Sequence, residues 1–332
     1  MVQRFAYGTG AILALLMLFT LDVLVARTSV ELDGALGDLL YRGSFVPLLF
    51  LVVILLGAFE MNRLLRAKGA RPHSIFAYVM IAVLLLTPWL SAAGWLGSAP
   101  EAVEGLYWQI VWLMVTGVGA GILGVMRRDP EGTSRDMGAT FILVFYLGFL
   151  GSFGLQLRCG RDVVGQQGAW LLLIVILLIK ISDIGAYLVG SAFGRHKVIP
   201  KISPAKTIEG VVGGMLAGTL AAVLIASASS MAAAADLGYE LHVAIDVVTG
   251  AFGVVDEAGG RPPIWQAALF GLAMSIAGQF GDSVESCFKR DAGIKDSGKL
   301  IPGFGGILDI IDSPVLAMPV AWFLLTVVWN VV

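Results

Sequence analysis

One stretch of the sequence reads GAWLLLIVILLIKISDIGAYLVG, from Gly168 to Gly190. Its apolar residues are continuous rather than alternating, and the stretch exceeds the roughly 20 residues that a helix needs to cross the hydrocarbon of a bilayer. In lipid, only helices and closed barrels satisfy every backbone hydrogen bond within the protein. A continuous run favours the helix, so this stretch predicts a transmembrane span.

Similar runs occur along the whole chain. Of its 332 residues, 58% are hydrophobic and 14% are charged, whereas a soluble domain carries about 25% charged residues. We therefore predict an all-α, polytopic transmembrane bundle of about nine spans. The predicted spans cover residues 7–27, 44–61, 74–96, 105–126, 138–157, 168–190, 208–228, 264–281 and 311–331. The eighth predicted span is the weakest because of its short length. It ends at Asp282, and its helix could continue past the membrane.

Basic residues alternate between two sets of loops, which predicts orientation because cytoplasmic loops are enriched in Lys and Arg. The richer set holds Arg4, Arg63, Arg66, Lys68, Arg71, Arg127, Arg128, Arg135, Arg195, Lys197, Lys201, Lys206, Lys289, Arg290, Lys295 and Lys299. The poorer set holds Arg27, Arg42, Arg158, Arg161 and Arg261. We expect a multi-pass protein of the inner cell membrane with its N-terminus in the cytoplasm. The net charge of −2 gives no reason to expect a nucleic-acid partner.

Residues 282–312 combine acidic, basic and glycine residues at the predicted cytoplasmic face. In a helix, Asp282 and Glu285 lie one turn apart, as do Asp309 and Asp312. Such hard oxygen ligands suit Mg²⁺, which uses one or two carboxylates together with substrate phosphates. The intervening cations and glycines suit phosphate oxygens. Basic orientation signals and acids favoured at helix N-termini explain single residues, but the density of both charges favours phosphoryl or nucleotidyl transfer.

A second polar segment follows the sixth span. Lys180 and Asp183 lie near its end, where ionisable residues are costly and usually functional, although Lys180 could simply snorkel. The run Ser203–Gly210 resembles a helix start, with Thr207 and Glu209 as capping residues. A helix N-terminus also binds phosphate, so capping leaves a substrate role open. By contrast, Asp22 and Glu60 lie near predicted span ends and are interpreted as interfacial residues.

The spacing of the first segment resembles the signature of the phosphatidate cytidylyltransferase (CDP-diacylglycerol synthase) family. The family pattern reads here as Ser286-Cys287-Phe288-Lys289-Arg290, Lys295-Asp296, Pro302-Gly303-Phe304-Gly305-Gly306 and Asp309-Ile310-Ile311-Asp312. The upstream stretches Asp183–Tyr187 and Ser203–Gly210 resemble two further family motifs. Two signature positions depart: the family's His is Phe304, and its Arg is Ile310. Loss of the Arg removes a bidentate phosphate ligand.

The resemblance implies transfer of a cytidylyl group from CTP to phosphatidate, which gives CDP-diacylglycerol and pyrophosphate. It implies Mg²⁺, alone or with a second cation, bilayer lipid as the environment of the substrate, and a homodimer. The expected metal ligands are Asp282, Glu285, Asp309 and Asp312. The expected catalytic residues are Lys206, Lys289, Arg290, Lys295 and Asp296. The expected substrate-binding residues are Ser203, Thr207, Glu209, Asp183, Gly305 and Gly306.

Two organisational predictions follow from the same reading. Residues 1–160 would form a lipid-facing or dimerising scaffold, and residues 161–332 a catalytic domain. The departures at Phe304 and Ile310 leave alternatives open: a weak or inactive paralog that binds lipid phosphate, or a related membrane lipid kinase or nucleotidyltransferase.

Overall fold

The computed structural model describes residues 17–26, 28, 37, 40–96, 104–127, 130–159, 166–234, 264–298 and 305–329. Within these residues, seven helices are long and apolar enough to cross a membrane: 45–67, 74–92, 106–126, 133–159, 168–193, 208–227 and 308–328. The prediction of an all-α polytopic membrane protein is therefore confirmed. The count of nine spans and the side of the N-terminus stay predictions, because most of the first predicted span lies outside the described residues.

Contacts along the chain divide it into two compact units. The first comprises Met1–Arg161 and Cys287–Ile311, and the second comprises Asp162–Ser286 and Asp312–Val332. The functional division into a scaffold and a catalytic domain at residue 160 stays a prediction.

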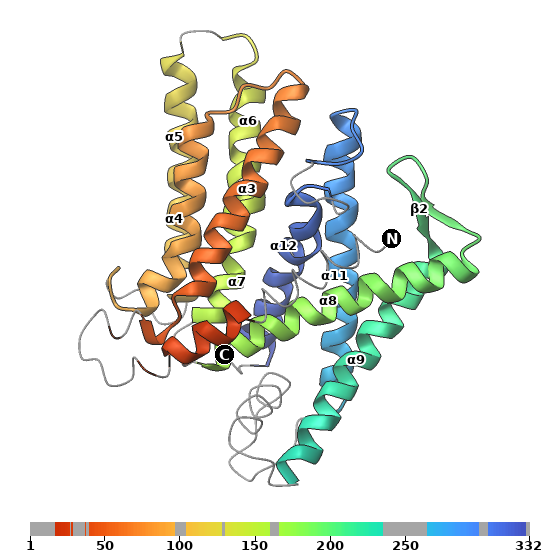
Figure 1. The fold of residues 1–332 in the computed structure, drawn as a ribbon. Coiled ribbons are helices and arrows are strands. Elements are labelled where there is room, and N and C mark those ends of the chain that lie inside the picture. The colour runs from red at the N-terminus through yellow and green to blue at the C-terminus, as the bar shows by residue number, and fades with distance from the viewer. Residues whose placement is uncertain are drawn as a thin grey trace. The chain divides into compact units, whose positions relative to one another are not determined.

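The first unit is built mainly from helices that run side by side (Figure 1). They are α3 (Phe45–Ala67), α4 (Ser74–Ala92), α5 (Glu104–Met126), α6 (Thr133–Leu143) and α7 (Leu150–Cys159), and a π-helical turn, η3 (Val144–Phe149), joins the last two. Fully buried Ile54, Ile81, Leu84 and Leu147 pack between them. Their long apolar runs thus bury one face in protein and leave the other to lipid.

The second unit centres on α8 (Gln166–Phe193) and α9 (Ile208–Ala234), which pack closely. Glycines allow the approach, because a Cβ at Gly185 would overlap Ala217 and one at Gly213 would overlap Val189. Small residues commonly bring membrane helices this close. The unit also holds most of α11 (Ile264–Asp291) and α12 (Leu308–Trp322), which ends in a π-helical turn, η4 (Phe323–Val328).

A β-hairpin joins α8 to α9 (Figure 1). Strand β1 (Lys197–Ile199) pairs antiparallel with β2 (Ser203–Thr207). The hairpin was not predicted from the sequence, but the helix begins at Ile208, where the predicted span 208–228 begins. The predicted cap at Thr207 is confirmed, because its Oγ1 accepts a hydrogen bond from the Gly210 amide at 3.2 Å. The option of a helix continuing beyond Asp282 is also confirmed, since α11 ends at Asp291.

Candidate active site

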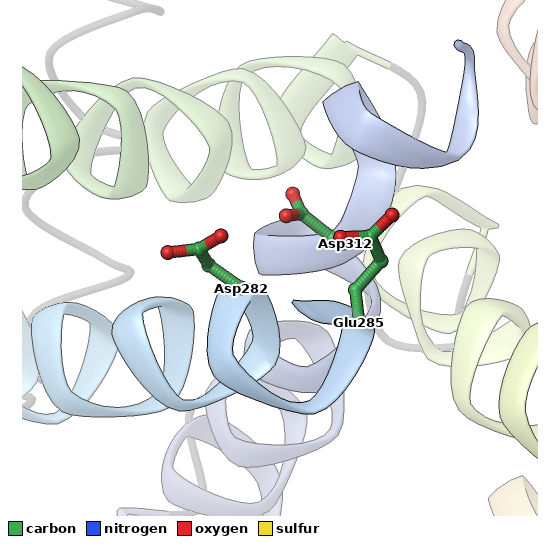
Figure 2. A group of neighbouring side chains, drawn as sticks. All are labelled: Asp282, Glu285 and Asp312. Carbon is green, nitrogen blue, oxygen red and sulfur yellow. The ribbon is translucent and has the colours of Figure 1, made fainter. Parts of the chain in front are cut away.

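Three of the predicted metal ligands lie together in the second unit. Asp282 and Glu285 extend from adjacent turns of α11 toward Asp312 on α12 (Figure 2). One oxygen of each carboxylate lies within 4.8 Å of the others. Glu285 and Asp312 are buried, while Asp282 is partly exposed. Gly281 permits this proximity, because a Cβ there would lie 2.5 Å from the Asp312 carbonyl oxygen.

Lys206, at the end of β2, is tied directly to this cluster. Its Nζ lies 2.9 Å from Asp282 Oδ2 and donates to the Gln279 carbonyl oxygen at 2.7 Å and to Ser283 Oγ at 2.8 Å. An ammonium group has three N–H donors, and three acceptors surround this one. The structure therefore places Lys206, from the polar segment that follows the sixth predicted span, in contact with the Asp282 carboxylate of the segment 282–312.

A second ion pair lies in the same unit, where Lys180 Nζ is 3.3 Å from Asp183 Oδ2 on α8. With every carboxyl group ionised, the three clustered acids and Asp183 carry four negative charges, against two positive charges on Lys180 and Lys206. The formal excess of two negative charges equals the charge of one divalent cation.

The donor set fits such a cation. Magnesium lies about 2.1 Å from its oxygen ligands, so opposite ligands are about 4.2 Å apart. Oxygens that already lie within 4.8 Å of one another need only small side-chain movements to reach that geometry. Carboxylate oxygens are also the ligand type that hard divalent cations prefer.

Asp309, the fourth predicted ligand, lies in the first unit and is heavily hydrogen-bonded there. Its Oδ1 accepts from Lys289 Nζ at 2.7 Å. Its Oδ2 accepts from the Gly306 amide at 2.7 Å, from Ser297 Oγ at 2.9 Å and from the Ser297 amide at 3.2 Å. Asp309 thus links Lys289, Ser297 and Gly306, and ligation of a metal would compete with these bonds.

The other predicted residues of the first unit lie at the end of α11 or between α11 and α12 in sequence. The Arg290 guanidinium donates to the Ile294 carbonyl oxygen at 3.2 Å, and Lys295 and Asp296 are exposed. Gly305 has a φ of +97°, which favours glycine. Of the two departures from the signature, Ile310 lies in the first turns of α12, and Phe304 lies outside the described residues.

The hairpin residues have mainly local partners. Thr207 is buried and caps α9, and Ser203 pairs with Ile199 in the hairpin. The Glu209 carboxylate accepts hydrogen bonds from the backbone amides of Arg195 and His196, and its Oε1 lies 2.6 Å from His196 Nδ1. Glu209 therefore anchors the base of the hairpin whose second strand contains Lys206.

Two acids have partners that the sequence did not predict. Asp22 and Glu60 are buried inside the protein, with relative exposures of 0% and 6%, and their place at the membrane interface stays a prediction. Asp22 pairs with Arg158 at 2.6 Å, and Glu60 binds residues around the start of α12. The available signal was that each acid belongs to an otherwise apolar run, where ionisable groups normally have a partner.

Comparison with known proteins identifies the family of this chain. The model of the cytidylyltransferase family matches residues 27–328. A phosphatidate cytidylyltransferase of Synechocystis is 30% identical over 314 residues, which cover 87% of this chain and 91% of the relative. The phosphatidate cytidylyltransferase of Mycobacterium bovis is 29% identical over 288 residues, covering 85% and 82%. An uncharacterized Escherichia coli protein, YnbB, is 38% identical over 199 residues, covering 60% of this chain and 57% of YnbB.

The family model matches nearly the whole chain, so the match includes both the membrane spans and the polar segments and is not limited to a short fragment. This chain belongs to the cytidylyltransferase family.

Proposed function

We propose that this chain transfers a cytidylyl group from CTP to phosphatidate and so forms CDP-diacylglycerol and pyrophosphate in phospholipid biosynthesis. The observation that carries the proposal is the cluster of Asp282, Glu285 and Asp312 with Lys206 bound to it. Family membership and two relatives named phosphatidate cytidylyltransferase support the choice of substrates.

In the proposed reaction, a phosphate oxygen of phosphatidate attacks the α-phosphorus of CTP. A new P–O bond forms there, while the bond from the α-phosphorus to the bridging oxygen breaks and pyrophosphate leaves with that electron pair. No covalent intermediate on the protein is needed, so positioning and charge stabilisation supply the catalysis.

We assign the divalent cation, with Mg²⁺ as the preferred ion, to Asp282, Glu285 and Asp312. When bound, the cation would supply positive charge next to the triphosphate. Lys206 orients Asp282 and contributes its own positive charge at the same place. Arg290 and Lys295 remain our candidates for contacts with phosphates, with Asp183 as the partner that orients Lys180. For Asp309 we favour a role in orienting Lys289, because its oxygens already accept hydrogen bonds from Lys289 and from the amides of Ser297 and Gly306.

The membrane setting suits a lipid substrate and a soluble nucleotide. We propose that the charged site lies at the cytoplasmic surface of the inner membrane, since basic residues dominate the predicted cytoplasmic loops. There the acyl chains of phosphatidate stay in the bilayer while its headgroup meets CTP. A homodimer is the expected assembly of the family.

The test uses the purified protein in detergent micelles with phosphatidate, Mg²⁺ and one of CTP, dCTP or ATP. We expect CDP-diacylglycerol and pyrophosphate in equal amounts with CTP and none with ATP. A folded protein that forms no CDP-lipid from CTP would overturn the proposal.

A pair of matched variants tests the metal assignment in the same assay. Asp312→Asn removes one carboxylate of the cluster, whereas Asp291→Asn removes an acid near the end of α11 whose side chain is 71% exposed. We expect turnover to fall only in Asp312→Asn. Equal turnover in both variants would remove Asp312 from the site.

A further inference from the structure

Glu60 holds the start of α12, although 248 residues separate it from Leu308 in sequence. Its Oε2 accepts a hydrogen bond from the Leu308 amide at 2.9 Å, and its Oε1 accepts one from the Ile307 amide at 3.1 Å. These amides lie at the N-terminus of α12, where backbone N–H groups have no partner inside the helix. A buried carboxylate from α3 thus takes the place of a local capping residue.

Ser297 connects Glu60 to Asp309. The Ser297 Oγ lies 2.9 Å from Glu60 Oε2 and 2.9 Å from Asp309 Oδ2. A hydroxyl carries one proton, so it donates to one carboxylate at a time. Asp309 in turn pairs with Lys289 at 2.7 Å. A continuous polar network therefore joins α3 to the end of α11 and the first turn of α12.

Two glycines of the segment are required by this carboxylate. A Cβ at Gly298 would overlap Glu60 Oε1, and a Cβ at Gly306 would overlap both Glu60 Oε2 and Ser297 Oγ. A side chain at either position would therefore push the Glu60 carboxylate or the Ser297 hydroxyl out of its hydrogen bonds. Packing of this kind keeps the backbone in one arrangement rather than several.

We propose that Glu60 is a positioning residue for the transferase reaction, a role that rests on the function proposed above. It fixes the first turn of α12, on which Asp309 orients Lys289. The residue lies in the part of the chain that the sequence assigns to a scaffold. Its carboxylate acts through the signature segment and needs no contact with substrate.

Glu60→Gln is the sharpest variant, because it keeps the shape of the side chain but places an amide N–H₂ against backbone N–H donors. Small displacements of catalytic groups can cost about 100-fold in rate. We expect kcat to fall about 10- to 100-fold on this basis, while the KM values for CTP and phosphatidate change less than about threefold. A residue that only stabilised the fold would lower the amount of active protein and leave kcat per folded molecule unchanged.

The matched control is Asp136→Asn, another buried acid of the same unit. Asp136 accepts hydrogen bonds from the Arg71 amide and from the Arg127 guanidinium, both at 2.7 Å. We expect this variant to lower thermal stability with kcat unchanged. The proposal is wrong if Glu60→Gln keeps the wild-type kcat. It is also wrong if Glu60→Gln loses activity only because less protein stays folded, as we expect for Asp136→Asn.

Hydrogen–deuterium exchange supplies a readout that does not need activity. Amides of residues 292–298 and 305–311 should exchange faster in Glu60→Gln than in the wild type and should not change in Asp136→Asn. Unchanged exchange in Glu60→Gln overturns the positioning role even if the enzyme proves to be a cytidylyltransferase. Conversely, a wild type that forms no CDP-lipid overturns the proposed function while the exchange result still reports on the connection.

If Glu60→Gln yields no folded protein, the same measurements of kcat and hydrogen exchange are made on Ser297→Ala. This change removes only the hydroxyl between the two carboxylates, so we expect a smaller loss of kcat and faster exchange in the same peptides. Wild-type values for both quantities would contradict the proposal.

Discussion

Replacement of Arg158 by leucine should destabilise the first unit strongly. The Arg158 side chain is fully buried, and its Nε and one terminal nitrogen donate to Asp22 Oδ2 at 2.8 and 2.6 Å. Asp22 Oδ1 accepts from the amides of Ser44, Phe45 and Val46 at 2.7, 2.8 and 3.2 Å. Arg158→Leu therefore leaves a buried carboxylate at the start of α3 without its ion-pair partner.

Loss of one member of a buried ion pair costs about 3–5 kcal/mol, because the remaining charge stays uncompensated. One kcal/mol shifts the Tm of a domain of 150–250 residues by roughly 2–4 °C. The expected decrease in Tm is therefore at least about 6 °C on these values. The apolar double variant Asp22→Leu/Arg158→Leu should lose less than the sum of the two single variants, since neither charge is then left alone.

The chain offers its own reporter for this measurement. Its two cysteines are free: Cys159, next to Arg158, is buried, and Cys287 is exposed. In a Cys287→Ser background, a fluorogenic thiol dye reports the exposure of Cys159 as the temperature rises. The control is Arg135→Leu, whose exposed guanidinium lies 3.7 Å from Asp136 and which should change stability by at most about 1 kcal/mol. Equal Tm values for Arg158→Leu and this control would refute the reasoning.

Three further predictions concern the site. Asp312→Asn should raise the Mg²⁺ concentration needed for half-maximal CDP-lipid formation by at least about 10-fold, because one ligand of three loses its charge; an unchanged Mg²⁺ titration would exclude it as a ligand. Lys206→Arg and Lys206→Ala should each lower kcat by roughly 100-fold, since a planar guanidinium cannot meet three acceptors arranged around an ammonium; wild-type turnover of the Arg variant would contradict this. Glu209→Gln should increase hydrogen exchange at residues 195–207, because the base of the hairpin loses its charge-assisted hydrogen bonds; protection equal to that of the wild type would show that Glu209 is not the anchor.

The fold class was predictable because it depends on local sequence. Each long apolar run satisfies its own backbone as a helix, so composition and run length suffice to predict a polytopic bundle. The spacing of Asp282 and Glu285 likewise predicted that both lie on one face of α11, since helical geometry is the same wherever the helix lies. The hairpin of Lys197–Thr207 was missed, because its strands are short and carry no periodic pattern.

The candidate site was only partly predictable for the same reason. All four acids were found from spacing and resemblance, but the sequence did not separate Asp312, which joins Asp282 and Glu285, from Asp309, which binds Lys289, Ser297 and Gly306. Both acids lie on α12 one turn apart. Which of them faces other carboxylates depends on the neighbours of the helix and not on its own sequence.

The amino-acid sequence by itself determined that this protein crosses a membrane repeatedly and carries a cytidylyltransferase signature. The first property depends on the length of apolar runs and the second on the spacing of polar residues, and both are local to single segments. Only the tertiary structure decided that Glu60 binds the start of α12, that Arg158 neutralises Asp22, and that Lys206 reaches Asp282. Each of these is a pair of polar groups far apart in the chain. A buried charge must find a partner wherever packing brings one, and packing is a property of the folded chain.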